Sequence, residues 1–256
     1  MISREELERA FDARFPPEVK EKLRRARVAV AGLGGLGSNI AVMLARSGVG
    51  ELHLVDNDTV SLSNLNRQII ALHSTLGRSK VEVAEERIHD INPHCKVVKY
   101  PFFYLPENAD MIDLTQMDYV VDCIDTVTAK VELISRCHKM GIPLLSCMGA
   151  ANKTDATAFR VSDIYKTTMD PLAKFLRKRL RALGIPSLKV VYSEEPPLHP
   201  VEKAVPDNNQ ADASAQTHRR DTPGSNAFVP AAAGLAAGGE VIKDLIATAE
   251  DHQEPT

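Results

Sequence analysis

The sequence of 256 residues has few cysteines, and no two of them form a C-x-x-C pair. This spacing excludes the usual zinc-ribbon arrangement, which needs two such pairs. The cysteines are Cys95, Cys123, Cys137 and Cys147, so none follows residue 147. Cys123 and Cys147 fall in apolar runs, and we expect both in the core because free cysteine is often buried. We also expect reduced thiols and a cytoplasmic location.

The sequence also lacks a strong charge of either sign and a long uninterrupted apolar stretch. Its formal net charge is −3, so contact with nucleic acid would need a local basic patch. Residues 1–27 are charged and contain no apolar signal-peptide core. Residues 228–249 are the most apolar late stretch, but Glu240, Lys243 and Asp244 interrupt them. We therefore expect a soluble protein with no membrane partner.

A glycine-rich stretch gives the strongest positive signal. Residues 28–58 read VAVAGLGGLGSNIAVMLARSGVGELHLVDND, an order of strand, glycine turn, helix, strand and acid that is typical of dinucleotide-binding folds. The turn glycines are Gly32, Gly34, Gly35 and Gly37. The following helix N-terminus would present N–H groups to a phosphate, and Asp56 stands where a ribose-binding acid is expected. We predict a nucleotide site, without a choice between NAD and ATP.

Strand and helix patterns alternate through the first 150 residues. Such alternation favours a mostly parallel sheet with right-handed crossovers. We predict an α/β, Rossmann-like fold with flanking helices and a smaller C-terminal substrate-binding region. The expected divisions are N-terminal helices at 1–26, an ATP-binding core at 27–150, and an extension at 151–256 with a mobile loop at 194–224.

A second cluster of polar residues narrows the choice of nucleotide. Its cations and amides are Asn64, Asn66, Arg67, Gln68 and Lys80. Cations beyond a phosphate-binding turn suit a triphosphate, because they neutralise charge that develops on phosphates during transfer. Carboxylates at strand ends suit Mg²⁺, which prefers carboxylate and phosphate oxygens. Asp125 is the best-placed candidate ligand for Mg²⁺, and Asp122 is the next. Asp58 stands beside Asp56 after the second predicted strand of the nucleotide-binding stretch.

The motifs GxGGxGS, DxDxVxxSNLNRQ and DCIDT, with Lys80 between the last two, resemble the adenylation domain of a known family. That family includes ubiquitin-activating enzymes and bacterial activators for thiamine and molybdopterin synthesis. The resemblance covers residues 25–150. It implies that the glycine loop and Asp56 hold ATP, that Arg67 and Lys80 bind phosphates, and that Asp125 binds Mg²⁺. It also implies a homodimer in which an N-terminal arginine, here Arg14, reaches the partner's site.

The later half, with FRVSDIYKTTMDPLAKFLRKRL and PGSNAFVPAAAGLAAGGEVIKDL, resembles the tRNA threonylcarbamoyladenosine dehydratases. This resemblance implies that ATP activates the threonine carboxylate of a modified adenosine beside the anticodon. The neighbouring carbamoyl group then closes a ring, with a net loss of water. Activation through an adenylate and activation through phosphate transfer both stay open. The resemblance also implies a cysteine-desulfurase sulfur-transfer system as a partner, although no residue of the sequence indicates that contact.

A basic helix predicted at residues 171–183 fits an RNA substrate. Its cations are Lys174, Arg177, Lys178, Arg179 and Arg181, with Arg160 and Lys166 before it. Of these, Lys174, Arg177, Lys178 and Arg181 are the predicted contacts to RNA phosphates. Arg219 and Arg220 in the predicted loop would extend the same surface. The alternative is a solvated helix face, which is the usual meaning of a charge run.

Two other functions fit parts of the sequence. The N-terminal block SREELERAFDARF resembles some thiamine-pathway activators, which adenylate the C-terminus of a small sulfur-carrier protein. Against this function, the chain lacks the C-x-x-C zinc pairs of those activators and has no late cysteine for a thioester route. The third candidate is a nucleotide-sensing or scaffold protein whose chemistry is lost, and the presence of Arg67, Lys80 and Asp125 argues against it.

Overall fold

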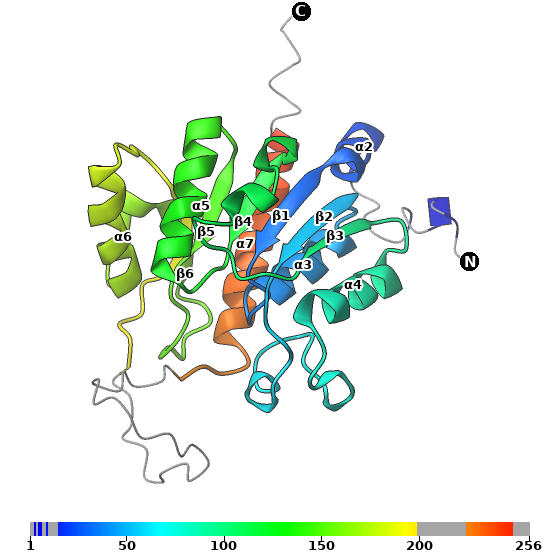
Figure 1. Cartoon of the computed structure of the whole chain (residues 1–256), viewed down its shortest axis with the longest axis horizontal. Coiled ribbons are helices and arrows are strands. Elements are labelled where there is room, and N and C mark those ends of the chain that lie inside the picture. The colour runs from blue at the N-terminus through cyan, green and yellow to red at the C-terminus, as the bar shows by residue number, and fades with distance from the viewer. Residues whose placement is uncertain (1–2, 4, 7–8, 10–14, 199–223, 248–256) are drawn as a thin grey trace, which may run out of the picture.

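The computed structural model describes residues 3, 5–6, 9, 15–198 and 224–247 (Figure 1). Arg14, Arg219, Arg220 and residues 199–223 of the predicted loop lie outside the described residues. Within the described part, no helix is both long enough and apolar enough to cross a membrane.

A seven-stranded sheet runs through the centre of the molecule in the order β3-β2-β1-β4-β5-β7-β6 (Figure 1). Its strands are β1 (Arg27–Ala31), β2 (Glu51–Val55), β3 (Lys96–Tyr100), β4 (Tyr119–Asp122), β5 (Leu144–Cys147), β6 (Phe159–Asp163) and β7 (Lys189–Ser193). Every neighbouring pair is parallel except the edge pair of β6 and β7. The predicted α/β class with a mostly parallel sheet is confirmed.

Helices cover both faces of this sheet. They are α2 (Pro17–Arg25), α3 (Gly37–Arg46), α4 (Lys80–Ile91), α5 (Val127–Met140), α6 (Pro171–Ala182) and α7 (Val229–Ala247). Short 3-10 turns lie between them: η1 (Leu62–Asn64), η2 (His73–Thr75), η3 (Ala109–Met111), η4 (Leu114–Gln116) and η5 (Ile164–Lys166). Apolar residues on α2, α3, α4 and α7 form one buried cluster with the sheet, and those on α5 and α6 pack on the other face.

Alternation along β1 explains this two-sided core. Val28 and Val30 point into the cluster with α3 and α7, whereas Ala29 and Ala31 point toward α5. Successive side chains of a strand face opposite sides of the sheet, so a strand covered on both faces is apolar throughout. All four of these residues are buried.

The part of the chain after residue 150 completes the same sheet. β7 pairs with β5, and β6 then pairs with β7 in the antiparallel sense. α7 returns across the molecule and packs against α3, where a Cβ on Gly234 would come within 2.8 Å of the Leu36 carbonyl oxygen. The helix therefore approaches the glycine loop closely because its surface is built from glycine and alanine. The division into three domains stays a prediction.

Candidate nucleotide-binding site

The glycine loop joins β1 to α3 at the carboxyl end of the sheet. Gly32 has a φ of +92°, and a Cβ there would lie 2.7 Å from the Cys123 carbonyl oxygen. Gly37 begins α3 so close to Gly32 that any side chain would overlap the Gly32 carbonyl. Gly34 differs because nothing lies within 4 Å of its Cβ position. The loop is therefore packed on its inner side and open at Gly34, as close approach of a phosphate requires.

Asp56 connects the end of β2 to this loop. Its Oδ2 accepts the Leu33 N–H at 2.6 Å, and its Oδ1 accepts the Asp58 N–H at 2.8 Å. Burial raises the pKa of the Asp56 carboxyl, while the charge of Lys80 and the two backbone N–H groups act in the opposite direction. A carboxylate has about four lone-pair positions, so both oxygens keep capacity for a ribose hydroxyl.

Lys80 lies against the same pair of acids. Its Nζ is 2.8 Å from the Asp58 Oδ2 and 3.9 Å from the Asp56 Oδ1. The Lys80 side chain is only 5% exposed, whereas that of Asp58 is 60% exposed. A buried ammonium needs an anionic partner, and here that partner stands at the surface where a phosphate oxygen could share the same lysine.

Arg67 packs against the glycine loop at Gly35. Its Cγ would be 3.5 Å from a Cβ on Gly35, and its guanidinium donates to the Ser63 carbonyl and the Asn66 Oδ1 at 2.8 and 2.9 Å. Asn66 in turn donates from Nδ2 to the Ser225 carbonyl at 2.9 Å. This asparagine therefore links Arg67 to the segment that leads into α7.

The other two amides of the cluster are buried. Asn64 accepts the Ser61 N–H at 3.0 Å and so shapes the turn that carries Arg67. Gln68 is also buried, and its Oε1 has no hydrogen-bond partner among the described residues. Direct contact of either amide with a nucleotide stays a prediction.

Asp122 ends β4 as part of a fully buried ion pair that the sequence reasoning missed. Its Oδ2 is 2.7 Å from the Lys130 Nζ and accepts the Ser146 hydroxyl at 2.6 Å. Lys130 also donates to the Cys147 carbonyl at 2.9 Å. The sequence contains one indication of this ion pair, a lysine at a position of the α5 pattern that is otherwise occupied by buried apolar residues. In this structure Asp122 holds the ends of β4 and β5 together, and its contact with a nucleotide stays a prediction.

Asp125 has the opposite environment, three residues further along. It is exposed just before α5, and the one hydrogen bond that its carboxylate accepts from the described residues is a long one, 3.4 Å from the Thr126 hydroxyl. No group of three or more His, Cys, Asp or Glu side chains in the described ranges could hold a metal ion. A cation here would therefore need ligands from a bound phosphate, which suits the known preference of Mg²⁺.

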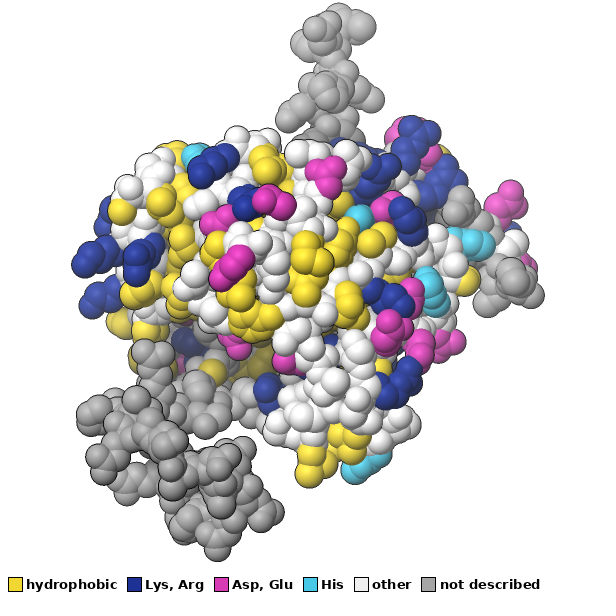
Figure 2. All heavy atoms as spheres, viewed as in Figure 1, with side chains coloured by type: hydrophobic (Ala, Val, Ile, Leu, Met, Phe, Trp, Pro, Cys, Tyr) yellow, Lys and Arg dark blue, Asp and Glu magenta, His cyan; other side chains and the backbone are white. Residues whose placement is uncertain are grey.

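The basic helix α6 lies apart from the glycine loop, on the face of the sheet that α5 also covers. Lys174, Lys178 and Arg181 are exposed, and Figure 2 shows a group of positive side chains at this edge of the molecule. Arg177 points inward instead, because its guanidinium donates to the Thr167 carbonyl at 3.0 Å and to the Thr167 hydroxyl. The structure thus gives Arg177 internal partners, and its contact with RNA stays a prediction.

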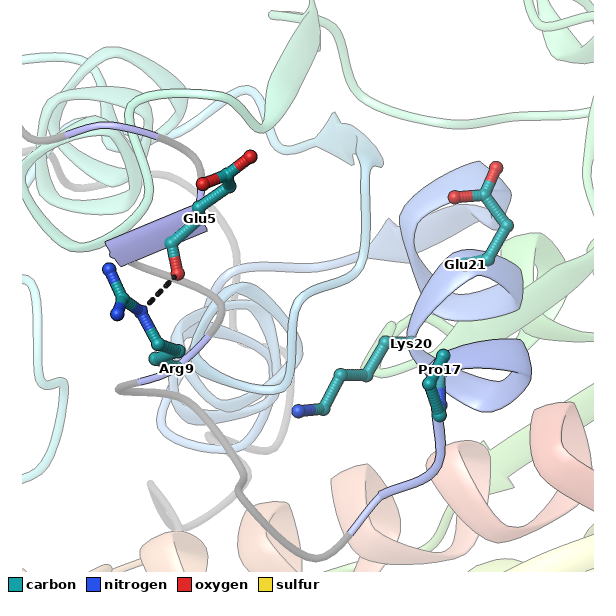
Figure 3. Close-up of a pocket in the computed structure, with 5 residues that line it drawn as sticks. All are labelled: Glu5, Arg9, Pro17, Lys20 and Glu21. Carbon is teal, nitrogen blue, oxygen red and sulfur yellow. Dashed lines mark hydrogen bonds between the residues drawn. The ribbon is translucent and has the colours of Figure 1, made fainter.

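A separate open pocket lies near the N-terminus. It is lined by Glu5, Arg9, Pro17, Lys20 and Glu21. Glu5 and Arg9 lie together on one side of it, where the Arg9 guanidinium donates to the Glu5 carbonyl (Figure 3). None of the predicted site residues lines this pocket. It therefore gives no support to a second nucleotide site.

The chain belongs to the ThiF family, whose model matches residues 7–256. The geometry above is consistent with that class: a glycine loop at the end of β1, an acid at the end of β2, and Arg67 and Lys80 beside them.

Particular relatives narrow the class. The tRNA threonylcarbamoyladenosine dehydratase of Bacillus subtilis is 45% identical over 227 residues, which cover 88% of this chain and 89% of the relative. The crystal structure of Escherichia coli tRNA N6-threonylcarbamoyladenosine dehydratase in complex with ATP superposes with a TM-score of 0.85 at 32% identity, and covers 98% of this chain and 99% of that one. The Escherichia coli molybdopterin-synthase adenylyltransferase is 38% identical over 58% of this chain and 59% of its own length.

Proposed function

We propose that this chain is an ATP-dependent enzyme that dehydrates threonylcarbamoyladenosine in tRNA. The observation that carries the proposal is similarity over almost the whole chain to dehydratases, one of which is known in complex with ATP. Similarity to the molybdopterin-pathway adenylyltransferase covers little more than half of the chain. The absence of a cysteine after residue 147 also argues against a thioester route.

The proposed reaction begins when a threonine carboxylate oxygen attacks a phosphorus atom of ATP and displaces pyrophosphate, if an adenylate forms, or ADP, if phosphate is transferred. The neighbouring carbamoyl oxygen then attacks the activated carboxyl carbon, the carbamoyl N–H loses its proton as the ring closes, and AMP or inorganic phosphate leaves with the former carboxylate oxygen. Arg67 and Lys80 would neutralise the charge that develops on the phosphate oxygens. The Arg67 side chain packs on Gly35 of the loop, and the Lys80 ammonium lies 3.9 Å from Asp56, whose carboxylate also holds the loop at Leu33; both positions support that role.

Within the same proposal, the nucleotide is held mainly by backbone groups and acids. The glycine loop, Gly32 to Gly37, would bind phosphate at the start of α3, and Asp56 would accept a ribose hydroxyl. Asp58, which pairs with Lys80 and is largely exposed, would have to share that lysine with a phosphate. The open space at Gly34 supports close approach of the ligand.

Asp125 would hold Mg²⁺ in this reaction. Its exposed carboxylate and weak internal hydrogen bond fit an ion that takes one protein ligand and several phosphate oxygens. When bound, Mg²⁺ would neutralise charge on the phosphate oxygens of ATP.

The tRNA is proposed to contact α6 through Lys174, Lys178 and Arg181, whose side chains are exposed. The protein is further proposed to act as a homodimer in the cytoplasm and to work beside a cysteine-desulfurase sulfur-transfer system. The two assemblies can be tested by light scattering of the purified protein and by co-purification with a desulfurase.

The decisive experiment supplies the protein with ATP, Mg²⁺ and tRNA that carries threonylcarbamoyladenosine. Mass spectrometry of the digested tRNA should show loss of one water from the modified nucleoside, and omission of ATP should abolish it. A parallel reaction replaces the tRNA with a small sulfur-carrier protein and follows pyrophosphate exchange. Intact tRNA together with exchange on the carrier would overturn the proposal in favour of the adenylyltransferase.

A further inference from the structure

One aromatic side chain on α6 is exposed among cations. Phe175 is 47% exposed, and the Arg179 guanidinium carbon lies 5.5 Å from its ring centroid. At this distance the guanidinium is attracted to the face of the ring, which keeps the two side chains together. The pair therefore presents an aromatic ring and a guanidinium, two groups on which a base can stack, on the outside of the helix.

The helix that carries the pair is firmly held. Asp170 caps its first turn by accepting the Ala173 N–H at 2.8 Å. Leu176 and Leu180 are fully buried against the sheet, and Arg177 is tied to the Thr167 carbonyl. The outward face is thus fixed before any partner arrives, which lowers the entropy lost on binding.

The charge around the pair is of one sign. α6 contains five cations and no acid between Pro171 and Ala182, in the sequence PLAKFLRKRLRA. Lys174 and Lys178 flank the ring at neighbouring positions and have no ion-pair partner among the residues that the structure describes. A polyanion with flat apolar faces would complement this surface in both charge and shape.

We propose that Phe175 and Arg179 form a stacking platform for an unpaired base of the RNA substrate, with Lys174 and Lys178 on the flanking phosphates. This inference rests on the proposed function, because it takes the RNA to be the tRNA whose modified adenosine lies in a single-stranded loop. Recognition of RNA loops commonly combines base stacking on aromatic rings with phosphate contacts.

An anionic membrane is the other partner that uses cations and apolar groups together. Interfacial helices present a broad apolar face, whereas α6 turns Ala173, Leu176 and Leu180 inward. Within α6 the exposed large apolar side chain is Phe175, and Met169 and Leu183 lie beyond the two ends of the helix. One aromatic ring among cations, without a broad apolar face, favours a nucleic-acid base over a lipid surface.

The test measures binding of an anticodon stem-loop RNA by fluorescence anisotropy at several salt concentrations. Phe175→Leu should raise the Kd about five- to hundredfold, since stacking of one base on an aromatic ring contributes about 1–3 kcal/mol. Phe175→Tyr should restore wild-type affinity because it keeps the ring. The matched control is Leu235→Ala on α7, which removes a similarly exposed apolar side chain, 51% exposed, and should change nothing.

Two further readouts separate stacking from general loss of charge or fold. The salt dependence of binding should keep its slope in Phe175→Leu, because the slope counts phosphate contacts. A 2-aminopurine placed in the RNA loop should be quenched by the wild-type protein and less so by Phe175→Leu.

Equal affinity and equal quenching in Phe175→Leu, with dehydration of tRNA intact in the wild type, would overturn the stacking platform and leave the proposed function standing. Failure of the wild type to dehydrate the modified tRNA would overturn the proposed function instead. Sedimentation with phosphatidylserine vesicles that depends on Phe175, together with unchanged RNA binding, would overturn the RNA assignment in favour of a membrane.

Discussion

The charged groups around the glycine loop differ from those on α6 in almost every physical respect. At the strand ends, Lys80 and Lys130 are buried and each has an acid within 2.8 Å. On α6, Lys174 and Lys178 are exposed and stand among like charges. Buried paired charges depend on exact geometry, whereas exposed charges of one sign act over a distance and are screened by salt.

The two regions therefore suit different kinds of ligand. The strand ends can fix a small ligand whose charge must be neutralised at defined atoms. The helix can attract a large polyanion without fixing each contact. Variants of the first region should therefore alter stability or turnover, and variants of the second should alter affinity and its dependence on salt.

The largest effect on stability is expected from Lys130→Met. Removal of the ammonium leaves the fully buried Asp122 without its counter-charge, which costs about 3–5 kcal/mol when a buried pair is broken. Urea unfolding followed by circular dichroism measures the change. Lys189→Met is the matched control, because Lys189 pairs with Glu240 and Asp244 but is 37% exposed, and pairs of this kind contribute about 0–1 kcal/mol. An equal loss of unfolding free energy in the two variants would contradict the distinction between buried and half-exposed ion pairs.

Asp125→Ala should reduce ATP turnover by at least about a hundredfold, because a bound divalent cation contributes several kcal/mol of charge stabilisation. The free energy of unfolding should not change, since the carboxylate is exposed and weakly hydrogen-bonded. Asp90→Ala removes an equally exposed acid at the end of α4 and serves as the control. Wild-type turnover in Asp125→Ala across a range of Mg²⁺ concentrations would remove this residue from the site.

Two glycine variants sharpen the distinction between packing and binding within the loop itself. Gly37→Ala should destabilise the fold by about 1–3 kcal/mol, because its Cβ overlaps the Gly32 carbonyl and forces the backbone to move. Gly34→Ala should keep the melting temperature, since its Cβ meets nothing within 4 Å, yet weaken ATP binding. Differential scanning fluorimetry with and without ATP measures both, and equal ATP affinity in Gly34→Ala and the wild type would show that no ligand approaches there.

Much of the fold could be predicted because its signals are local. The apolar run and glycines at residues 28–37 predict a strand and a turn, and β1 and α3 lie there. The insertion of β7 between β5 and β6 could not be predicted, because strand order depends on contacts between distant segments. The pairing of Asp122 with Lys130 was missed for the same reason, since it also needs Ser146 and the Cys147 carbonyl from β5.

The direction of side chains was the least predictable property of the candidate sites. Four cations of α6 were expected to act alike, yet Arg177 reaches the Thr167 carbonyl and the other three lie at the surface. The helical spacing predicts on which side of the helix each residue lies. It does not predict the direction of a long side chain, which turns toward the hydrogen-bond acceptors that neighbouring segments provide. Here the acceptors are the carbonyls of Ile164, which begins η5, and of Thr167, which follows it.

Variants of α6 should change RNA binding rather than turnover at saturating RNA. Lys174→Glu with Lys178→Glu should weaken binding of the tRNA and reduce the slope of log affinity against log salt by about one for each lysine that contacts a phosphate. Lys139→Glu, an exposed lysine at the end of α5, is the matched control. Arg177→Ala should lower stability because it removes the internal hydrogen bonds to Thr167, and any loss of slope in this variant would measure the predicted contact of Arg177 with RNA. An unchanged salt slope in the double variant would show that α6 is a solvated helix face and does not contact RNA phosphates.

The smallest effect is expected from Cys147→Ser. Cys147 is buried and accepts a hydrogen bond from the Cys123 Sγ at 3.7 Å, and this bond, together with burial, raises the pKa of the Cys123 thiol. The Cys123 thiol is therefore a poor nucleophile, and Cys147 itself is buried. Turnover on modified tRNA should therefore match the wild type, as measured by the mass of the product nucleoside. A variant that folds normally but makes no product would return thiol chemistry to the strand ends, where we propose roles for oxygen and nitrogen groups only.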